Sequence, residues 1–218
     1  MLSCLCCALL ATSYTIDLGL PTLKSTGDYT KVNISGGQLY AQPGEPALPW
    51  LASKLLLPLG EEAGKITVKM SNPHRFKLDK PIQPADANYP FSMKEVPPPF
   101  GPDEKIYTSE TPWPAVNNNG VNTQFLAGHP INFTAYCPFE YYPLTNELVF
   151  YQSVSITVES HSSSRAQAAL ALLKQDAFIS ERLKSSVDNI DQLPSYRNRQ
   201  SGADYLIIHA TAKTSQWT

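Results

Sequence analysis

Apolar and polar side chains alternate at every second position in four segments of the chain, residues 14–20, 64–70, 129–137 and 147–160. An alternation of period two is typical of strands that bury one face and leave the other, here including Asn132 and Thr134, in water. Because Pro, Gly and Asn turns separate these segments, the pattern predicts a mainly β fold, an antiparallel β-sandwich or jelly-roll. The side chains predicted to face the core are Ile16, Leu18, Leu20, Ile66, Val68, Met70, Ile131, Phe133, Ala135, Leu148, Phe150, Val154, Ile156 and Val158.

The segment GEPALPWLASKLLLPLG, residues 44–60, is apolar but interrupted by prolines. Its three consecutive leucines, 55–57, predict a strand with neighbours on both sides. Proline cannot donate to a strand ladder, so the prolines are expected to mark the ends of this strand. Gly44 and Gly60 are expected to allow the sharp turns that flank it. The prolines concerned are Pro46, Pro49 and Pro58.

The composition changes after Glu159. Residues 161–186 are rich in good helix formers, with serines before Arg165 that can cap a helix, and they predict a helical connector. Its apolar positions at helical spacing are Leu172, Ile179 and Leu183. Residues 187–202 are polar and end in glycine, which indicates a linker. The apolar run ADYLIIHA that follows is typical of a buried strand in a parallel α/β sheet.

The first residues, MLSCLCCALLATS, are apolar and end in small residues, as export signals do. No other run reaches the roughly 18 apolar residues of a membrane-spanning helix. The expected organisation is an export-signal remnant at 1–13, a β-sandwich at 14–162, a helix and linker at 163–202, and the first strand of a truncated α/β domain at 203–218.

Composition narrows the possible functions. The 218 residues carry a formal net charge of −2, and no basic stripe indicates nucleic-acid binding. The 19 prolines and 11 tyrosines favour an extracellular all-β domain, with an ordinary cytosolic β domain as the alternative. Residues 84–114 are proline-rich and without periodicity, and a loop of that length is usually functional or disordered.

Motifs for catalysis are absent from the sequence. The cysteine of the chain body, Cys137, lies among aromatic residues and is expected to pack as a small apolar side chain. After the cysteine-rich N-terminal stretch, residues 14–218 contain no metal-ligand spacing, P-loop, G-x-S-x-G or CxxC pattern, so neither a metal nor a cofactor is expected. Asn33 and Asn132 match the acceptor pattern for N-glycosylation. The four histidines, scattered along the chain, are His74, His129, His161 and His209.

Three stretches, in this order, resemble a known family. QPGEPALPWLASKLLLPLG and the segment from YTSETPWPAV to ELVFYQSVSITV resemble the pro-region of gingipain-type cysteine peptidases, and GADYLIIHA resembles the first strand of their catalytic domain. The resemblance covers most of the chain from Asp17 to Ala210. It implies a secreted or cell-surface zymogen, exported by a bacterial-type route, whose pro-region assists folding and keeps the enzyme latent.

The same resemblance implies the partner and the site residues. The partner would be a caspase-like cysteine endopeptidase domain, downstream or separate, whose catalytic Cys–His pair lies outside this chain. In the family a pro-region loop offers a basic residue to the specificity pocket, and the candidates here are Lys94 and Lys105. Arg197 and Arg199, in a polar stretch, are the candidates for the processing site.

Alternatives to these interpretations remain at the level of sequence. Lys94 and Lys105 could be ordinary solvated lysines, and the two arginines ordinary linker residues. A secreted β-sandwich rich in aromatic residues could instead be a binding module for carbohydrate or a cell-surface ligand. In that case Trp50 and Trp113 would be the stacking platforms.

Overall fold

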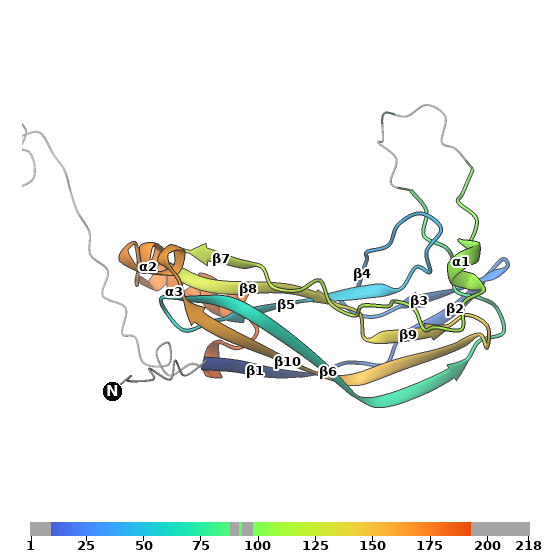
Figure 1. The fold of residues 1–218 in the computed structure, drawn as a ribbon, viewed down its shortest axis with the longest axis horizontal. Coiled ribbons are helices and arrows are strands. Elements are labelled where there is room, and N and C mark those ends of the chain that lie inside the picture. The colour runs from blue at the N-terminus through green and yellow to red at the C-terminus, as the bar shows by residue number, and fades with distance from the viewer. Residues whose placement is uncertain (1–9, 88–91, 93–97, 193–218) are drawn as a thin grey trace, which may run out of the picture.

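Antiparallel strands dominate the computed structural model, which describes residues 10–87, 92 and 98–192 (Figure 1). The strands are β1 (Leu10–Asp17), β2 (Thr22–Thr26), β3 (Tyr29–Asn33), β4 (Gln38–Leu39), β5 (Pro49–Leu56), β6 (Glu61–Lys77), β7 (Thr123–Leu126), β8 (His129–Tyr136), β9 (Phe139–Tyr142) and β10 (Glu147–Ser162). One sheet has the order β1-β10-β6 with β9 also paired to β10, and a second has the order β4-β5-β8-β7. The mainly β, antiparallel fold predicted from the alternation is confirmed.

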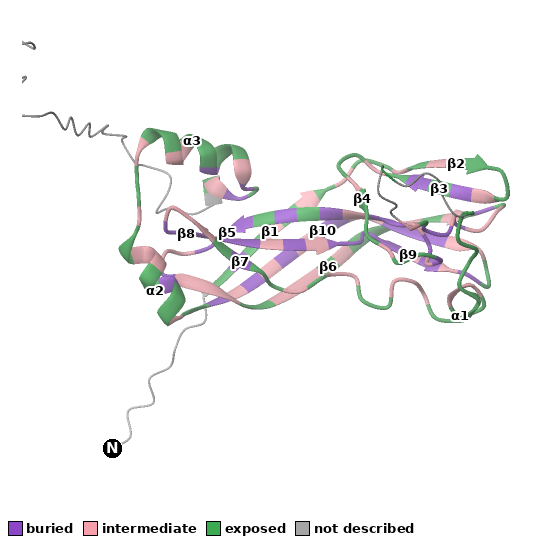
Figure 2. Cartoon of the chain, turned by 90° about the horizontal axis from the view of Figure 1, so that it is seen from above, coloured by how far each residue is buried: buried purple, intermediate pink, exposed green. Residues whose placement is uncertain are grey.

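The apolar core lies between these two sheets. In one cluster, Leu55 and Tyr136 from the second sheet pack against Val154 and Ile156 of β10. Burying each such aliphatic side chain stabilises the fold by about 1.5–3 kcal/mol relative to exposure. Figure 2 shows buried residues alternating with less buried ones along these strands. The β10 side chains predicted to face the core are all 0% exposed: Leu148, Phe150, Val154, Ile156 and Val158.

Two predictions from the alternation are wrong. Leu20 was expected in the core, but β1 ends at Asp17 and Leu20 is 62% exposed. Asn132 and Thr134 were expected in water, but both are buried.

β8 is covered on both faces, which explains the second error. Ile131 packs against α3 residues on one side. On the other, Asn132 accepts a hydrogen bond from the N–H of Asn122 (3.0 Å), and its amide donates to Thr134 Oγ1 (2.8 Å). Thr134 in turn donates to the Gly120 carbonyl (3.1 Å). Local hydrogen bonds therefore allow a polar face to be buried, and they bury the acceptor side chain of the Asn132 glycosylation pattern.

The proline-flanked strand forms largely as predicted. β5 begins at Pro49, and Gly44 and Gly60 have φ angles of +90° and +77°. β8 pairs with β5 from Leu51 to Leu56, whereas β4 reaches only the first two residues of β5. The leucines 55–57 therefore have a strand neighbour on one side only.

The connector contains two helices where one was predicted. These are α2 (Ser164–Ala171) and α3 (Ala177–Ser186), followed by a 3₁₀ turn, η1 (Ile190–Gln192). Ser163 caps α2, as expected from the serines, and Asp176 Oδ1 caps α3 by accepting from the N–H of Ile179 (2.8 Å). Of the apolar positions at helical spacing, Leu172 lies at the end of α2 and is 73% exposed, whereas Leu183 of α3 is buried.

The N-terminal end of the structure differs from the expected boundary, and the C-terminal end of the sequence lies outside the described residues. β1 begins at Leu10, which pairs with Ser160, so the last residues of the stretch assigned to an export signal belong to the sheet. The apolar run at 203–210 lies outside the described residues. Among the helices of the described residues, none is long and apolar enough to cross a membrane.

Candidate functional site

Segments distant in sequence meet where the long loop between β6 and β7 leaves the body. The Gly44 N–H donates to the carbonyl oxygen of Ala85 (2.8 Å), and the Gly44 carbonyl accepts from the N–H of Asp103 (2.9 Å). Asp86 Oδ1 accepts from the N–H of Phe100 (3.3 Å). We call Gly44, Ala85, Asp86, Phe100 and Asp103 the loop base. Its hydrogen bonds join the residues that come before and after the segment 88–97.

Gly44 is required at this position for two reasons. Its φ of +90° is a conformation that L side chains rarely adopt. A Cβ there would also lie 3.2 Å from the carbonyl oxygen of Gly101. The glycine that opens the proline-rich segment thus allows the loop base to close.

Lys105 lies next to the loop base, on the short helix α1 (Glu104–Tyr107). Asp103 caps this helix by accepting a hydrogen bond from the Lys105 N–H (2.9 Å). The Tyr107 hydroxyl donates to the Ile82 carbonyl (2.8 Å), and burial raises the Tyr107 pKa well above its usual value. Lys105 is therefore an exposed cation on an anchored helical backbone. Lys94, the other candidate, lies outside the described residues.

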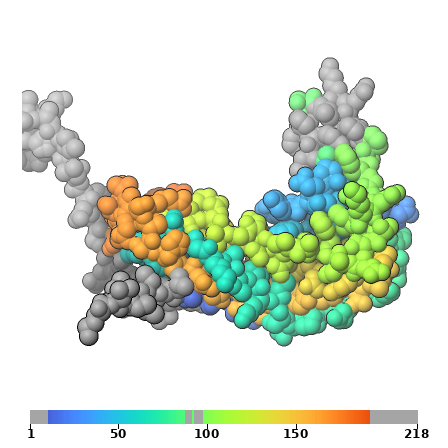
Figure 3. Space-filling view, viewed as in Figure 1, coloured from blue at the N-terminus to red at the C-terminus, as the bar shows by residue number. Residues whose placement is uncertain are grey.

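A groove of about 680 Å³ opens beside the loop base, and we call it the aromatic groove. Tyr40 lies edge-on to Trp50, with ring centroids 5.5 Å apart. Trp50 and Trp113 both reach the groove but also pack against the core, so neither is a free-standing platform. In Figure 3 the blue segment around β4 and the green segment before β7 meet at this end. The lining residues are Leu39, Tyr40, Ala41, Gln42, Pro43, Glu45, Trp50, Asp86, Ala87, Trp113, Pro114, Ala115 and Val116.

At the helical end, two residues after α3 close the edge of β5 that β4 does not reach. Asn189 Oδ1 accepts from the Leu56 N–H (2.8 Å), and its amide donates to the Leu56 carbonyl (3.0 Å). Asp188 Oδ2 accepts from the Lys54 N–H (2.7 Å), and the Asp188 N–H donates to the Lys54 carbonyl (2.9 Å). We call Asp188 and Asn189 the connector clamp, because they supply the hydrogen bonds of a missing strand.

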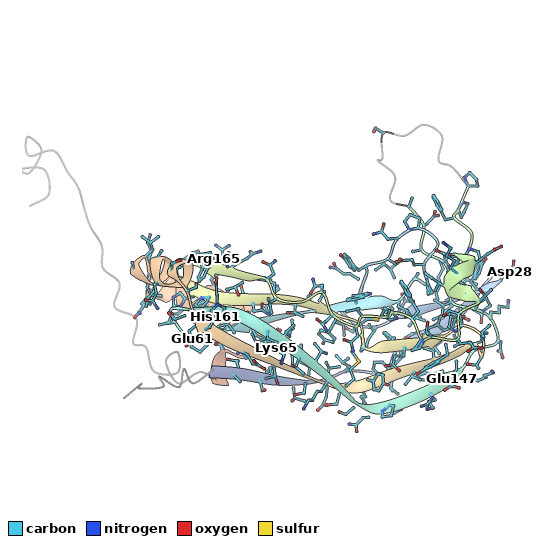
Figure 4. The ribbon with its side chains drawn as sticks, in the orientation of Figure 1. Asp28, Glu61, Lys65, Glu147, His161 and Arg165 are labelled. Carbon is cyan, nitrogen blue, oxygen red and sulfur yellow. The ribbon has the colours of Figure 1, made fainter. Side chains whose placement is uncertain are left out.

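Helix α2 is fastened to the sheets by polar contacts. Arg165 Nε donates to Glu62 (3.0 Å), and Arg165 Nη2 donates to the Thr123 carbonyl (2.7 Å). The guanidinium also lies 5.1 Å from the centre of the Phe125 ring. Figure 4 shows Arg165 and His161 together at this end, far along the body from Glu147. These contacts attach α2 to the sheets.

Cys137 is buried in the core, where its expected packing as a small apolar side chain is confirmed. Burial raises the pKa of its thiol to about 12, so the nucleophilic thiolate is suppressed. Within the described part of the chain, no three His, Cys, Asp or Glu side chains gather where a metal ion could bind. Arg197 and Arg199 lie outside the described residues.

Sequence reasoning brought Lys105 and the proline-rich loop together but missed the groove and the clamp. Leu39 belongs to the two-residue strand β4 and Tyr40 directly follows it, and this strand is too short to show an alternation. Asn189 lies in a polar stretch that reads as a linker, and only its buried position distinguishes it. Hydrophobic periodicity cannot predict that a polar residue such as Asn189, directly after a helix, will be buried.

Comparisons with known proteins identify the class of this two-layered β body. It is the pro-region of a peptidase. The Propeptide_C25 family model matches residues 22–186. The chain therefore belongs to the Propeptide_C25 family, as the resemblance to gingipain-type pro-regions predicted.

Solved structures support the same assignment at the level of the fold. One is a complex of the pro- and mature domains of RgpB from Porphyromonas gingivalis, with a TM-score of 0.66 and 16% identity, covering 84% of this chain and 93% of that one. Another, from a study of the zymogenic latency of gingipain K from the same organism, has a TM-score of 0.56 and 17% identity, covering 70% and 88%. No curated protein matches the chain.

Proposed function

We propose that this chain is the latency-maintaining pro-region of a gingipain-like cysteine endopeptidase, which it inhibits and helps to fold. The observation that carries the proposal is the family match over 22–186, on a fold similar to that of the RgpB pro-domain, which was solved together with its mature domain. The partner is then the mature peptidase domain, caspase-like in fold, whose first strand is the run at 203–210. Export through the apolar N-terminus makes the precursor secreted or surface-bound.

Inhibition works through the loop that leaves the loop base. A peptidase cleft binds its target in extended form, so an inhibitory residue needs an extended backbone on a rigid support. The hydrogen bonds of Gly44 and Asp86 supply the support on both sides of the segment 88–97. Preorganising the stems in this way lowers the entropic cost of binding.

Lys94 is the stronger of the two candidates for the residue that enters the cleft. Lys105 lies in a helical turn, in which the Tyr107 N–H donates to the Asp103 carbonyl (2.9 Å), and α1 would have to unwind to enter a cleft. Lys94 is followed closely by prolines, which favour an extended backbone in the residues before them.

Inhibition assays in trans, with the mature domain from the full-length precursor, test this assignment. Lys94→Ala should raise the inhibition constant of the 218-residue chain roughly 30-fold or more, as for the loss of an interface hot spot. Lys105→Ala is the matched control and should change it less than about threefold. Inhibition by both variants equal to that of the unmodified chain would contradict the assignment. A full-length gene without a downstream Cys–His pair would contradict the proposed function itself.

Release of the enzyme requires cleavage after the connector clamp. Arg197 and Arg199 lie in a polar stretch suited to proteolysis, directly before the apolar run. N-terminal sequencing of the matured protein should place the new terminus between Arg197 and Asp204. A terminus on the N-terminal side of the clamp would reject this processing site.

A further inference from the structure

The aromatic groove leaves large apolar side chains in water. Leu39, Tyr40 and Val116 are 64%, 67% and 65% exposed, and all three line the same groove. Single exposed apolar residues are normal on a protein surface, whereas a contiguous apolar patch with a polar rim marks an interaction site. This rim includes Gln42 and Glu45, joined by a hydrogen bond of 2.7 Å from the Gln42 N–H to the Glu45 carboxylate.

We propose that the aromatic groove is a docking surface for the mature peptidase domain, separate from the inhibitory residue itself. This inference rests on the proposed function. The proposed function requires only that the loop enters the cleft. This inference adds a second, apolar contact that anchors the pro-region beside the cleft.

The groove is continuous with the loop base. Asp86 and Ala87 line the groove and are also the last described residues before the segment 88–97. A stable interface buries about 800 Å² on each partner. A domain that holds the loop in its cleft therefore covers the groove as well, because the groove begins at the stem of the loop.

Charge at this end indicates the kind of surface that covers it. The described parts of residues 38–50, 82–87 and 98–117 carry five acidic side chains and one lysine, Lys105, and Lys31 of β3 lines an adjoining hollow with Leu39 and Asp86. The partner surface around the cleft should therefore be basic, and association should be electrostatically steered. The acidic side chains are Glu45, Asp86, Asp103, Glu104 and Glu110.

Tyr40 is the residue best placed to act as the anchor. It is exposed, yet its ring is held edge-on against Trp50, so little conformational freedom is lost on binding. Exposed Tyr and Trp side chains in such positions dominate interface energetics. A sugar ligand is less favoured because Trp50 and Trp113 use part of their surface against the core.

The test uses the 218-residue chain, the mature domain and two variants of one type. Tyr40→Ala should raise the inhibition constant about 10- to 100-fold, chiefly through faster dissociation, with an unchanged melting temperature. Phe178→Ala is the control, because Phe178 is an aromatic residue of similar exposure (69%) on α3, at the other end of the body. It should leave the inhibition constant unchanged, and the association rate of the unmodified chain should fall as salt is added.

Each other outcome has a defined meaning. Wild-type inhibition by Tyr40→Ala, while Lys94→Ala relieves inhibition, would overturn this inference and leave the proposed function intact. No inhibition by the unmodified chain would overturn the proposed function instead. Sedimentation showing that Tyr40→Ala dissociates a dimer of the unmodified chain, or glycan-induced changes in tryptophan fluorescence without peptidase binding, would assign the groove to another occupant and overturn the inference.

Discussion

The helical end and the loop end of this body treat their apolar surface in opposite ways. At the helical end, Leu183 of α3 is 2% exposed against Leu56 and Ile131, and the connector clamp satisfies the open edge of β5. At the loop end, Leu39 and Tyr40 remain about two-thirds exposed over an open groove. The pro-region thus completes its own packing at the helical end, and it leaves apolar surface uncovered at the loop end, where the enzyme is proposed to bind.

Among variants that test this difference between the two ends, we expect the largest loss of stability from a substitution in the connector clamp. Asn189→Ala removes the partners of both the N–H and the carbonyl of Leu56, which is itself fully buried. Leaving buried polar groups unsatisfied costs about 1–3 kcal/mol each, so we expect a loss of about 3 kcal/mol in the free energy of unfolding. Urea denaturation followed by circular dichroism measures it.

Two further variants should lose less stability in the same urea denaturation assay. Asp188→Ala should cost about 1 kcal/mol, because Asp188 is exposed although its carboxylate accepts from Lys54 and Ser53. Asn33→Ala, at an exposed strand end, is the matched control and should stay within about 0.5 kcal/mol. Equal stability of the Asn189 and Asn33 variants would show that the helical end is not closed by the clamp.

The sequence predicted the sheets better than it predicted the surfaces. Val154, Ile156 and Val158 alternate because they face one core, and a period of two reports that burial directly. The burial of Asn132 depends on hydrogen bonds to residues that precede β7, and alternation cannot report a face that is both polar and buried.

The connector and the groove show the same limit. The helix break at Leu172 to Asp176 depends on a capping carboxylate, which is a short signal inside a run of helix formers. The aromatic groove joins residues more than 60 positions apart, Tyr40 and Val116, which no local pattern relates. The family resemblance supplied the loop as a candidate site, and geometry supplied its base and its neighbouring groove.

Hydrogen exchange, measured by mass spectrometry on the 218-residue chain with and without the mature domain, shows whether the loop end is the surface that binds the peptidase. The account predicts slower exchange on complex formation in residues 39–45 and 113–117, at the loop end. Residues 164–186, at the helical end, should exchange at the same rate in both samples. Protection of the helices α2 and α3 with no change around Tyr40 and Val116 would contradict the account.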